Sequence, residues 1–248
     1  MKKICIISNS SYNLINFRKE LIISLISKGY HVYTITPDNN YSVALSNLGC
    51  VNYILSYGSH NTNLFLNIKN FINHFKLIRK IGPKFILSFT IKPNLISFII
   101  SLISLGNYKV IATISGLGTV FIKQNMKFIF LRYLYIFLSK FSYHCFFHNE
   151  DDLKLFSKIN KKVSIVPGSG IDLNKFEIVK NNNFDNKNFL FVGRLINEKG
   201  LNELIQASKM LISRNIDLSL TIISDYDEQN PNSINSDLIN EINNSKFI

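Results

Sequence analysis

Short apolar runs alternate with amphipathic stretches along the chain, and this alternation is the first structural signal. Mostly apolar runs of four to six residues predict buried strands at residues 4–8, 32–35, 51–55, 85–89, 110–114, 143–147, 163–166, 188–192 and 218–223. Apolar residues at three- and four-residue spacing predict helices at residues 17–26, 41–48, 64–81, 95–105, 127–141, 150–159, 200–214 and 234–243. Strands and helices in strict turn predict an α/β protein with parallel sheets.

The segment 181–187 divides the predicted elements into two domains. Its residues 181–186 are polar except for one phenylalanine, which is the composition of a linker. Residues 1–180 supply seven strands, enough for a complete Rossmann-like domain with a parallel sheet. Residues 188–248 supply two strands and two helices, too few for a parallel sheet that is covered on both faces. We therefore expect one complete domain followed by the beginning of a second.

Composition fits a packed protein without a disulfide framework. Of the 248 residues, 46% are hydrophobic and 12% aromatic, which is enough for a sizeable core. Cys5, Cys50 and Cys145 lie far apart and fall in or beside strand-like runs, so they are expected to be buried thiols in a reducing compartment. Neither Cys nor His residues show metal-ligand spacing, and we expect no metal site.

Positive charge is concentrated in the first three quarters of the chain. Residues 1–186 hold 22 Lys and Arg against 8 Asp and Glu, a net +14, whereas residues 187–248 hold 6 against 8, a net −2. Such a bias attracts anionic lipid, a phosphate-rich substrate or nucleic acid. Lysine is abundant throughout, so compositional bias explains the charge equally well. No nucleic-acid-binding motif is present, and we expect no nucleic-acid partner.

Two cations follow the predicted strand at 188–192, where it gives way to a helix. Gly193 breaks the strand, Arg194 and Lys199 follow, and Gly200 precedes the helix. Ligands of open α/β sheets bind at such strand ends, and a helix amino end favours anions. Arg194 can bind phosphate oxygens with two nitrogens, and Lys199 adds a point charge. The turn therefore predicts a diphosphate site, with two solvated cations on an ordinary loop as the alternative.

The loop after the first predicted strand carries Asn16 and Arg18. The pattern G-x-G-x-x-G is absent there, which argues against a nicotinamide-dependent dehydrogenase. Asn16 is expected to cap the following helix, and Arg18 to lie in its first turn. A cation there opposes the helix dipole, so it needs a separate reason. Binding an acceptor phosphate is one reason, and a solvated surface arginine fits about as well.

Further candidates follow the fourth and fifth predicted strands. Lys92 lies just after the fourth strand and is expected to point into a cleft, where it can pair with phosphate. Gly116 and Gly118 lie in the loop after the fifth strand and allow close approach of an acceptor to the backbone. Alone, such a glycine loop is most often just a turn.

The loops after the sixth and seventh predicted strands add four candidates. His148 and Asn149 precede three acidic residues, and that acidic cluster suits a helix amino end and its dipole. Gly170 and Asp172 lie after the seventh strand, where two glycines and an aspartate favour a sharp turn. The other histidines show no ligand spacing.

Four of these loops, in the same order, resemble those of family 4 glycosyltransferases, which are retaining enzymes of the GT-B fold. The matching stretches are Thr90-x-Lys92-Pro-Asn, Gly116-Leu-Gly118, the turn around Gly170-x-Asp172, and the decapeptide FVGRLINEKG at 191–200. The resemblance implies an acceptor-side domain at 1–180 and a donor-binding domain from 188. It also implies that Gly193, Arg194 and Lys199 hold the diphosphate of a nucleotide sugar.

The resemblance implies a hexosyl or N-acetylhexosaminyl transferase of surface-polysaccharide type. Its donor would be a UDP-sugar, and its acceptor a polyprenyl-diphosphate-linked saccharide at the cytoplasmic membrane face. Asn16, Arg18, Lys92, His148 and Asn149 would lie on the acceptor side of the cleft. No cofactor is implied, and no metal is required, because two cations can take the charge of the leaving diphosphate. No catalytic residue is assigned, and the histidine that many members carry near residue 90 is missing.

The segment 123–140, which contains most of the helix predicted at 127–141, suggests contact with a membrane surface. It is apolar nearly all round and carries four cations, a pattern that fits a helix half in a core and half against anionic lipid. A buried helix is the better explanation for most of its aromatic residues. The apolar run at 95–105 is far shorter than the ~20 residues that a bilayer span needs. We therefore expect a cytoplasmic protein bound peripherally to the inner face of the plasma membrane.

The sequence also departs from the family. The acidic motif that holds the donor ribose and sugar in relatives has no counterpart after residue 200. We therefore expect a C-terminally truncated enzyme whose 248-residue polypeptide has little transferase activity. The alternative is a non-catalytic remnant or binding subunit that needs a partner for the missing donor half.

Overall fold

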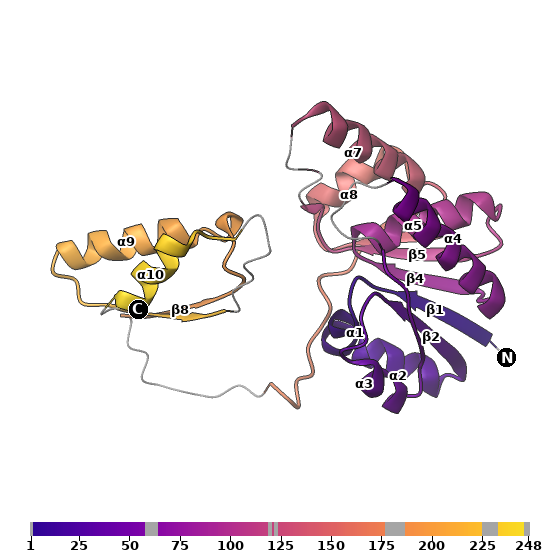
Figure 1. Cartoon of the computed structure of the whole chain (residues 1–248), viewed down its shortest axis with the longest axis horizontal. Coiled ribbons are helices and arrows are strands. Elements are labelled where there is room, and N and C mark those ends of the chain that lie inside the picture. Colours follow the sequence, from indigo (N-terminus) through magenta and orange to yellow (C-terminus); the bar gives the residue numbers. More distant parts are fainter. Residues whose placement is uncertain are drawn as a thin grey trace. The chain divides into compact units, whose positions relative to one another are not determined.

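The computed structural model describes residues 2–57, 64–118, 121, 124–176, 187–224 and 233–245. Their contacts divide the chain into two compact units, Met1–Leu173 and Asn174–Ile248 (Figure 1). Residues 181–186 of the predicted linker lie outside the described residues, so the boundary at 181–187 stays a prediction.

A seven-stranded parallel sheet forms the centre of the first unit. Its strand order is β3-β2-β1-β4-β5-β6-β7, with the bounds β1 (Lys2–Ile7), β2 (Tyr30–Thr36), β3 (Val51–Ile54), β4 (Phe85–Phe89), β5 (Lys109–Ile114), β6 (His144–Phe147) and β7 (Val163–Ile165). The order reverses at β1, where Ile4 pairs with Val32 of β2 on one side and Phe85 of β4 on the other. Loops leaving β1 and β4 therefore diverge at their carboxyl ends, which opens a crevice for a ligand.

Helices flank the sheet on both faces (Figure 1). One face carries α1 (Ser11–Phe17), α2 (Lys19–Ser27) and α3 (Ser42–Asn47), and the other carries α4 (Leu64–Ile81), α5 (Ile91–Ile103), α7 (Met126–Ser139) and α8 (Glu150–Ser157). Two apolar cores follow from this division. The smaller one joins Ile4, Leu14 and Ile22 on the α1–α3 face. The larger one fills the opposite face, where Phe98 and Phe156 are fully buried.

The short helix α1 was not predicted, and it changes the positions expected for Asn16 and Arg18. Ser10 caps α1 by accepting a hydrogen bond from the amide of Asn13, at 3.1 Å. Asn16 therefore does not cap a helix; it lies in the last turn of α1, where its Nδ2 donates to the carbonyl of Tyr12. Arg18 separates α1 from α2 and precedes the first turn of α2 rather than lying in it.

The second unit contains a parallel pair of strands covered by helices on one face. Its elements are β8 (Asn188–Val192), the 3₁₀ turn η1 (Asn197–Lys199), α9 (Leu201–Ser213), β9 (Ser219–Ile223) and α10 (Ser236–Asn244). Leu201, Ile205 and Leu220 form its core with residues of α10. An ion pair of 2.6 Å between Lys209 and Glu241 joins the two helices.

The other face of this strand pair is bare among the described residues. Leu190 and Val192 of β8 are 63% and 68% exposed, and Ile223 of β9 is 57% exposed. Val192 and Ile223 are partners in the ladder, so their side chains lie together on this face. The expectation that residues 188–248 form only the beginning of a domain stays a prediction.

Candidate functional site

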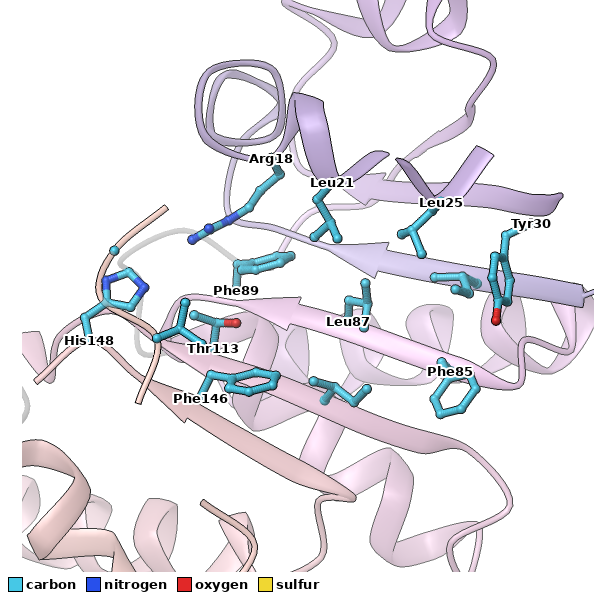
Figure 2. Close-up of a pocket in the computed structure, with 14 residues that line it drawn as sticks. Arg18, Leu21, Leu25, Tyr30, Phe85, Leu87, Phe89, Thr113, Phe146 and His148 are labelled. Carbon is cyan, nitrogen blue, oxygen red and sulfur yellow. The ribbon is translucent and has the colours of Figure 1, made fainter. Parts of the chain in front are cut away.

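A pocket of about 410 Å³ opens beside the point where the strand order reverses (Figure 2). Its floor is apolar and comes mainly from β4, β5 and β6, whereas Leu21 and Leu25 of α2 form one wall. Arg18, Thr113 and His148 line it at the carboxyl ends of the strands. The pocket therefore combines a long apolar surface with a polar end.

The apolar floor follows from the pattern of a parallel strand that is hydrophobic on both faces. In β4, Phe85, Leu87 and Phe89 line the pocket, and Ile86 between them lies in the large core on the opposite face. The sequence predicted β4 as a strand but not which residues face a pocket. Helices α1–α3 pack on β1 and β2, and this leaves part of the neighbouring strands open on the same face.

Arg18 is held at the polar end of the pocket by a neighbouring aromatic ring. Its guanidinium carbon lies 4.3 Å from the centre of the Phe89 ring, which is a cation–π contact. Burial lowers the pKa of Arg18 from its usual value, yet arginine stays protonated in proteins. Its Nε is buried and has no hydrogen-bond partner among the described residues.

His148 comes from the opposite side of the pocket, directly after β6. Burial, and secondly the charge of Arg18, lower the pKa of His148 below its usual 6.5, so the imidazole is neutral at pH 7. Its Nε2 is buried and lacks a hydrogen-bond partner within the described part of the chain. The structure thus brings together two predicted residues that are 130 positions apart in the sequence.

Lys92 does not line this pocket. It is the second residue of α5, and its side chain is exposed. The neighbouring Asn94 is fully buried, and its Nδ2 donates to the carbonyl of Thr113 and to the Tyr135 hydroxyl, each at 3.1 Å. Thr90 precedes α5 with a φ of 74°, a conformation that costs a β-branched residue energy and often marks functional sites. The predicted role of Lys92 stays a prediction.

The predicted glycine loops lie at the carboxyl edge of the sheet, and they differ in whether their conformation requires glycine. Gly118 has a φ of 58°, and a Cβ there would lie 3.2 Å from Cδ1 of Ile91, so this position requires glycine. Gly116 has open space around it. Gly170 has a φ of 77°, which fits the predicted sharp turn, and Asp172 nearby is exposed. None of these four residues lines the pocket.

Asn149 has a structural role as a helix cap. Its Oδ1 accepts a hydrogen bond of 2.8 Å from the amide of Asp152, and its Nδ2 donates to the Asp152 carboxylate at 2.9 Å. The acidic residues after it form the first turn of α8, as the sequence indicated. These contacts account for the conformation of Asn149 without a ligand.

Replacing Asn149 with alanine is therefore expected to lower stability without affecting ligands of the pocket. Loss of a cap costs about 1 kcal/mol, measurable by denaturant unfolding. The matched control is Asn125→Ala, because Asn125 caps α7 by the same contact with the amide of Phe128. If Asn149→Ala weakened diphosphate binding more than Asn125→Ala did, the purely structural role of Asn149 would be contradicted.

In the second unit, Arg194 and Lys199 lie between β8 and α9, as the sequence predicted. Lys199 ends η1, and Gly200 adopts a φ of 73° immediately before α9. Both cations are exposed, and within the described ranges neither side chain forms an ion pair. The Gly193 amide donates to the Ile223 carbonyl at 3.3 Å, so it extends the strand pair.

The backbone amides that are available to bind an anion are those at the start of α9. The first amides of an α-helix have no partner within the helix, and they point out of its amino end. Arg194 and Lys199 both precede this end in the chain. The turn can therefore supply two flexible cations and a helix dipole to one anionic group.

The three cysteines are buried free thiols. Burial raises the pKa of Cys50 and of Cys145 to about 11, and it raises the pKa of Cys5 further still. Thiols with raised pKa values hold little thiolate at neutral pH and react slowly. They therefore serve as small apolar core residues.

Comparison with solved structures shows which fold the chain shares. In the solved structures, a sucrose-phosphate synthase from Thermosynechococcus elongatus matches 98% of this chain and 67% of its own, with a TM-score of 0.66 and 16% identity. An Anabaena protein in complex with UDP matches 92% and 70%, with a TM-score of 0.59 and 10% identity. The predicted α/β fold of GT-B type is thereby confirmed. A putative UDP-N-acetylglucosamine 2-epimerase from Listeria monocytogenes shares it, with a TM-score of 0.59.

A relative with a named activity shows which kind of enzyme the chain is similar to in sequence. The chain is 25% identical over 228 residues to an N,N'-diacetylbacillosaminyl-diphospho-undecaprenol α-1,3-N-acetylgalactosaminyltransferase of Campylobacter jejuni. The match covers 84% of this chain and 60% of that enzyme. No protein-family model matches the chain. The chain is thus a homologue of a bacterial glycosyltransferase, which confirms the resemblance inferred from the loops.

Proposed function

We propose that the protein is a glycosyltransferase that moves a hexose or N-acetylhexosamine from a UDP-sugar to a polyprenyl-diphosphate-linked saccharide in surface-glycan synthesis. The observation that carries the proposal is the turn between β8 and α9, where Arg194 and Lys199 precede a helix amino end. The Campylobacter relative supports the acceptor, because its name specifies a diphospho-undecaprenol substrate. The UDP complex of the Anabaena protein supports the donor.

The chemistry of this turn suits a leaving diphosphate. Breaking the bond between sugar and diphosphate places negative charge on the phosphate oxygens. Arg194 and Lys199 can neutralise that charge without a metal ion, and the helix dipole adds to their effect. On the acceptor side, the proposal assigns binding of the acceptor to Asn16, Lys92, Gly116, Gly170 and Asp172, which follow strands β1, β4, β5 and β7 of the first unit.

A transfer assay tests the proposal. The purified 248-residue polypeptide is incubated with radiolabelled UDP-hexoses and UDP-N-acetylhexosamines and a polyprenyl-diphosphate-linked saccharide, and the lipid fraction is counted. Label in that fraction, dependent on both substrates, supports the proposal. Absence of both transfer and UDP binding would contradict it.

A binding subunit is the alternative, and the bare face of β8 and β9 favours it. Leu190, Val192 and Ile223 expose an apolar surface that parallel sheets normally bury. In this alternative the polypeptide binds UDP, and a partner completes the donor site. Turnover of the isolated polypeptide at about 1 s⁻¹, near the lower end of typical enzymes, would exclude it.

We also propose peripheral binding to the inner face of the plasma membrane through α7. Met126, Phe130, Tyr133 and Phe137 recur at spacings of four, three and four, so they form one stripe, and each is at least half exposed. The explanation of the aromatic residues by burial therefore holds for Tyr135, but it does not hold for the residues of this stripe. In the described part of the chain, no helix is long and apolar enough to span a bilayer.

Charge beside the stripe suits anionic lipid. Lys127 and Lys140 on and just after α7 are exposed. Arg132 is directed towards the protein, since its Nη2 donates to the Phe121 carbonyl at 2.8 Å. Lys123, the fourth predicted cation, lies outside the described residues. Aromatic side chains flanked by lysines bind the interface of anionic bilayers.

Replacing Phe130 and Phe137 together with serine is expected to weaken binding to phosphatidylglycerol vesicles about tenfold, because less apolar area enters the bilayer. Co-sedimentation with vesicles measures the effect. Val43→Ser with Ile54→Ser is the control, since these exposed residues lie outside the stripe. Equal binding by the two double variants would contradict the role of α7.

A further inference from the structure

Two polar atoms at one end of the pocket lack partners. Nε of Arg18 and Nε2 of His148 are both buried without a hydrogen bond among the described residues. Both side chains line the same pocket from opposite sides, and Figure 2 shows the Arg18 guanidinium and the His148 imidazole at the end of the pocket where the strands end. Buried polar atoms are normally satisfied, so a side-chain rotation that turns both nitrogens towards an acceptor group in the pocket would remove two energetic penalties at once.

The hydrogen-bond donors of Arg18 and His148 determine which chemical group can bind to both. A protonated guanidinium offers several N–H groups and no acceptor, and imidazolium offers a donor at each nitrogen. A ligand that accepts from both must carry several oxygen atoms and negative charge. Phosphate and diphosphate meet this requirement, and the cation–π contact with Phe89 holds the guanidinium in place for them.

We propose that Arg18 and His148 together bind a phosphate or diphosphate anion, and that this binding takes up a proton at His148. The inference rests on the proposed function in one respect only, which is that the natural ligand is the diphosphate of the acceptor. The anion site itself is defined by the pocket. Arg18 and His148 are binding residues here, and neither is assigned a step in sugar transfer.

Proton uptake follows from the charges around His148. In the free protein, Arg18 and burial disfavour the imidazolium. A bound anion reverses the local sign of charge, so it raises the pKa of His148. Between the two pKa values the complex holds one proton more than the free protein, and affinity for the anion therefore rises as pH falls.

The other groups near His148 do not reverse the direction of this change in its pKa. The residues that line the pocket from β4, β5 and the loop after β7 are uncharged, and Tyr30 of β2 lies at the far end of the pocket. On its own side of the chain, His148 precedes the acidic first turn of α8, which consists of Glu150, Asp151 and Asp152. This acidic turn is present both in the free protein and in the complex, so it does not reverse the change that the anion causes.

The experiment measures the affinity for inorganic diphosphate by calorimetry at pH 5.5 and pH 8, for the wild type and His148→Gln. Ionisation of diphosphate itself affects both proteins equally, so their affinity ratio isolates His148. We expect the wild type to bind about tenfold more tightly than His148→Gln at pH 5.5, the worth of one charge-assisted hydrogen bond, and equally at pH 8. Identical pH profiles for the two proteins would overturn the proposal.

Arg18→Gln tests the other half of the site. We expect it to weaken diphosphate binding at both pH values, whereas Arg18→Lys keeps the charge and recovers part of the affinity. Thermal unfolding of each variant establishes that it is folded. An unchanged affinity in a folded Arg18→Gln variant would overturn the proposal.

A spectroscopic measurement separates this site from the donor turn. The pKa of His148, followed by NMR and assigned with His148→Gln, is expected to rise on addition of diphosphate. It should rise equally in a variant with Arg194→Gln and Lys199→Gln, because that change leaves the pocket intact. A shift that vanishes in this variant would place the anion elsewhere and overturn the proposal. The same NMR measurement, made in the Arg194→Gln and Lys199→Gln variant, distinguishes the sources with farnesyl diphosphate and UDP. A shift of His148 at lower concentrations of UDP than of farnesyl diphosphate would overturn the acceptor assignment. Absence of sugar transfer would affect only the proposed function.

Discussion

Replacing Phe156 with alanine is expected to destabilise the first unit by about 3–5 kcal/mol. The side chain is fully buried, and its ring contacts those of Phe121, Tyr135 and Phe147 at centroid distances of 6.2, 5.9 and 5.0 Å. These rings come from the segment before α7, from α7 itself and from β6, so one residue of α8 joins three parts of the unit. Truncation removes the ring contacts and leaves a cavity that close-packed neighbours fill only in part.

Guanidinium chloride unfolding followed by circular dichroism measures this effect. Phe130→Ala is the matched control, because its side chain is 66% exposed and lies on α7 of the same unit. Exposed substitutions of this kind change stability by only about 0.5 kcal/mol or less. Similar midpoints for the two variants would mean that the aromatic cluster does not hold α8 on the sheet.

Removing both cations of the donor turn, by Arg194→Gln with Lys199→Gln, is expected to weaken UDP binding about 100-fold. Hydrogen bonds to charged groups contribute about 1.5–3 kcal/mol each, and a diphosphate can engage both side chains. Isothermal titration calorimetry with UDP and with uridine measures the effect. Affinity for uridine should stay unchanged, since it lacks the diphosphate.

The control for this variant removes the same charge from the same unit. Lys209 and Arg214 lie in and just after the later part of α9, away from its amino end. Lys209→Gln with Arg214→Gln should leave UDP affinity within about twofold, because exposed charges beyond a Debye length of ~8 Å are screened in physiological salt. Equal losses in the two double variants would indicate general electrostatic attraction, and the site at the turn would be wrong.

Strands and helices with one strong local hydrophobic pattern were predictable from the sequence. The strands β4 and β8 and the helix α4 have the predicted bounds, because an apolar run or a long amphipathic repeat ends at glycine, proline or a polar loop. The parallel sheet follows from strand–helix alternation. The turn with Arg194 and Lys199 was predictable for the same reason, since its strand, cations and helix are consecutive in the chain.

Features that depend on distant partners were not predictable. The first helix, α1, is fixed in part by Asp38, whose carboxylate accepts from the Ser11 amide at 3.0 Å across 27 positions. The sequence singled out Arg18 and His148 separately, but nothing in it indicates that they line one pocket. Asn149 was placed in a cleft, and only the hydrogen bonds with Asp152 reveal its capping role.

The strand pair of the second unit has a consequence for the behaviour of the chain in a crowded solution. Among the described residues, β8 and β9 pair only with each other, so the two-stranded sheet has an outer edge at each strand. Such edges are templates for a further strand, and here they border the bare apolar face of Leu190, Val192 and Ile223. Lys187, directly before β8, is the nearest lysine in the chain and opposes such pairing by its charge. The segment that carries the proposed nucleotide-binding turn is thus also expected to promote aggregation.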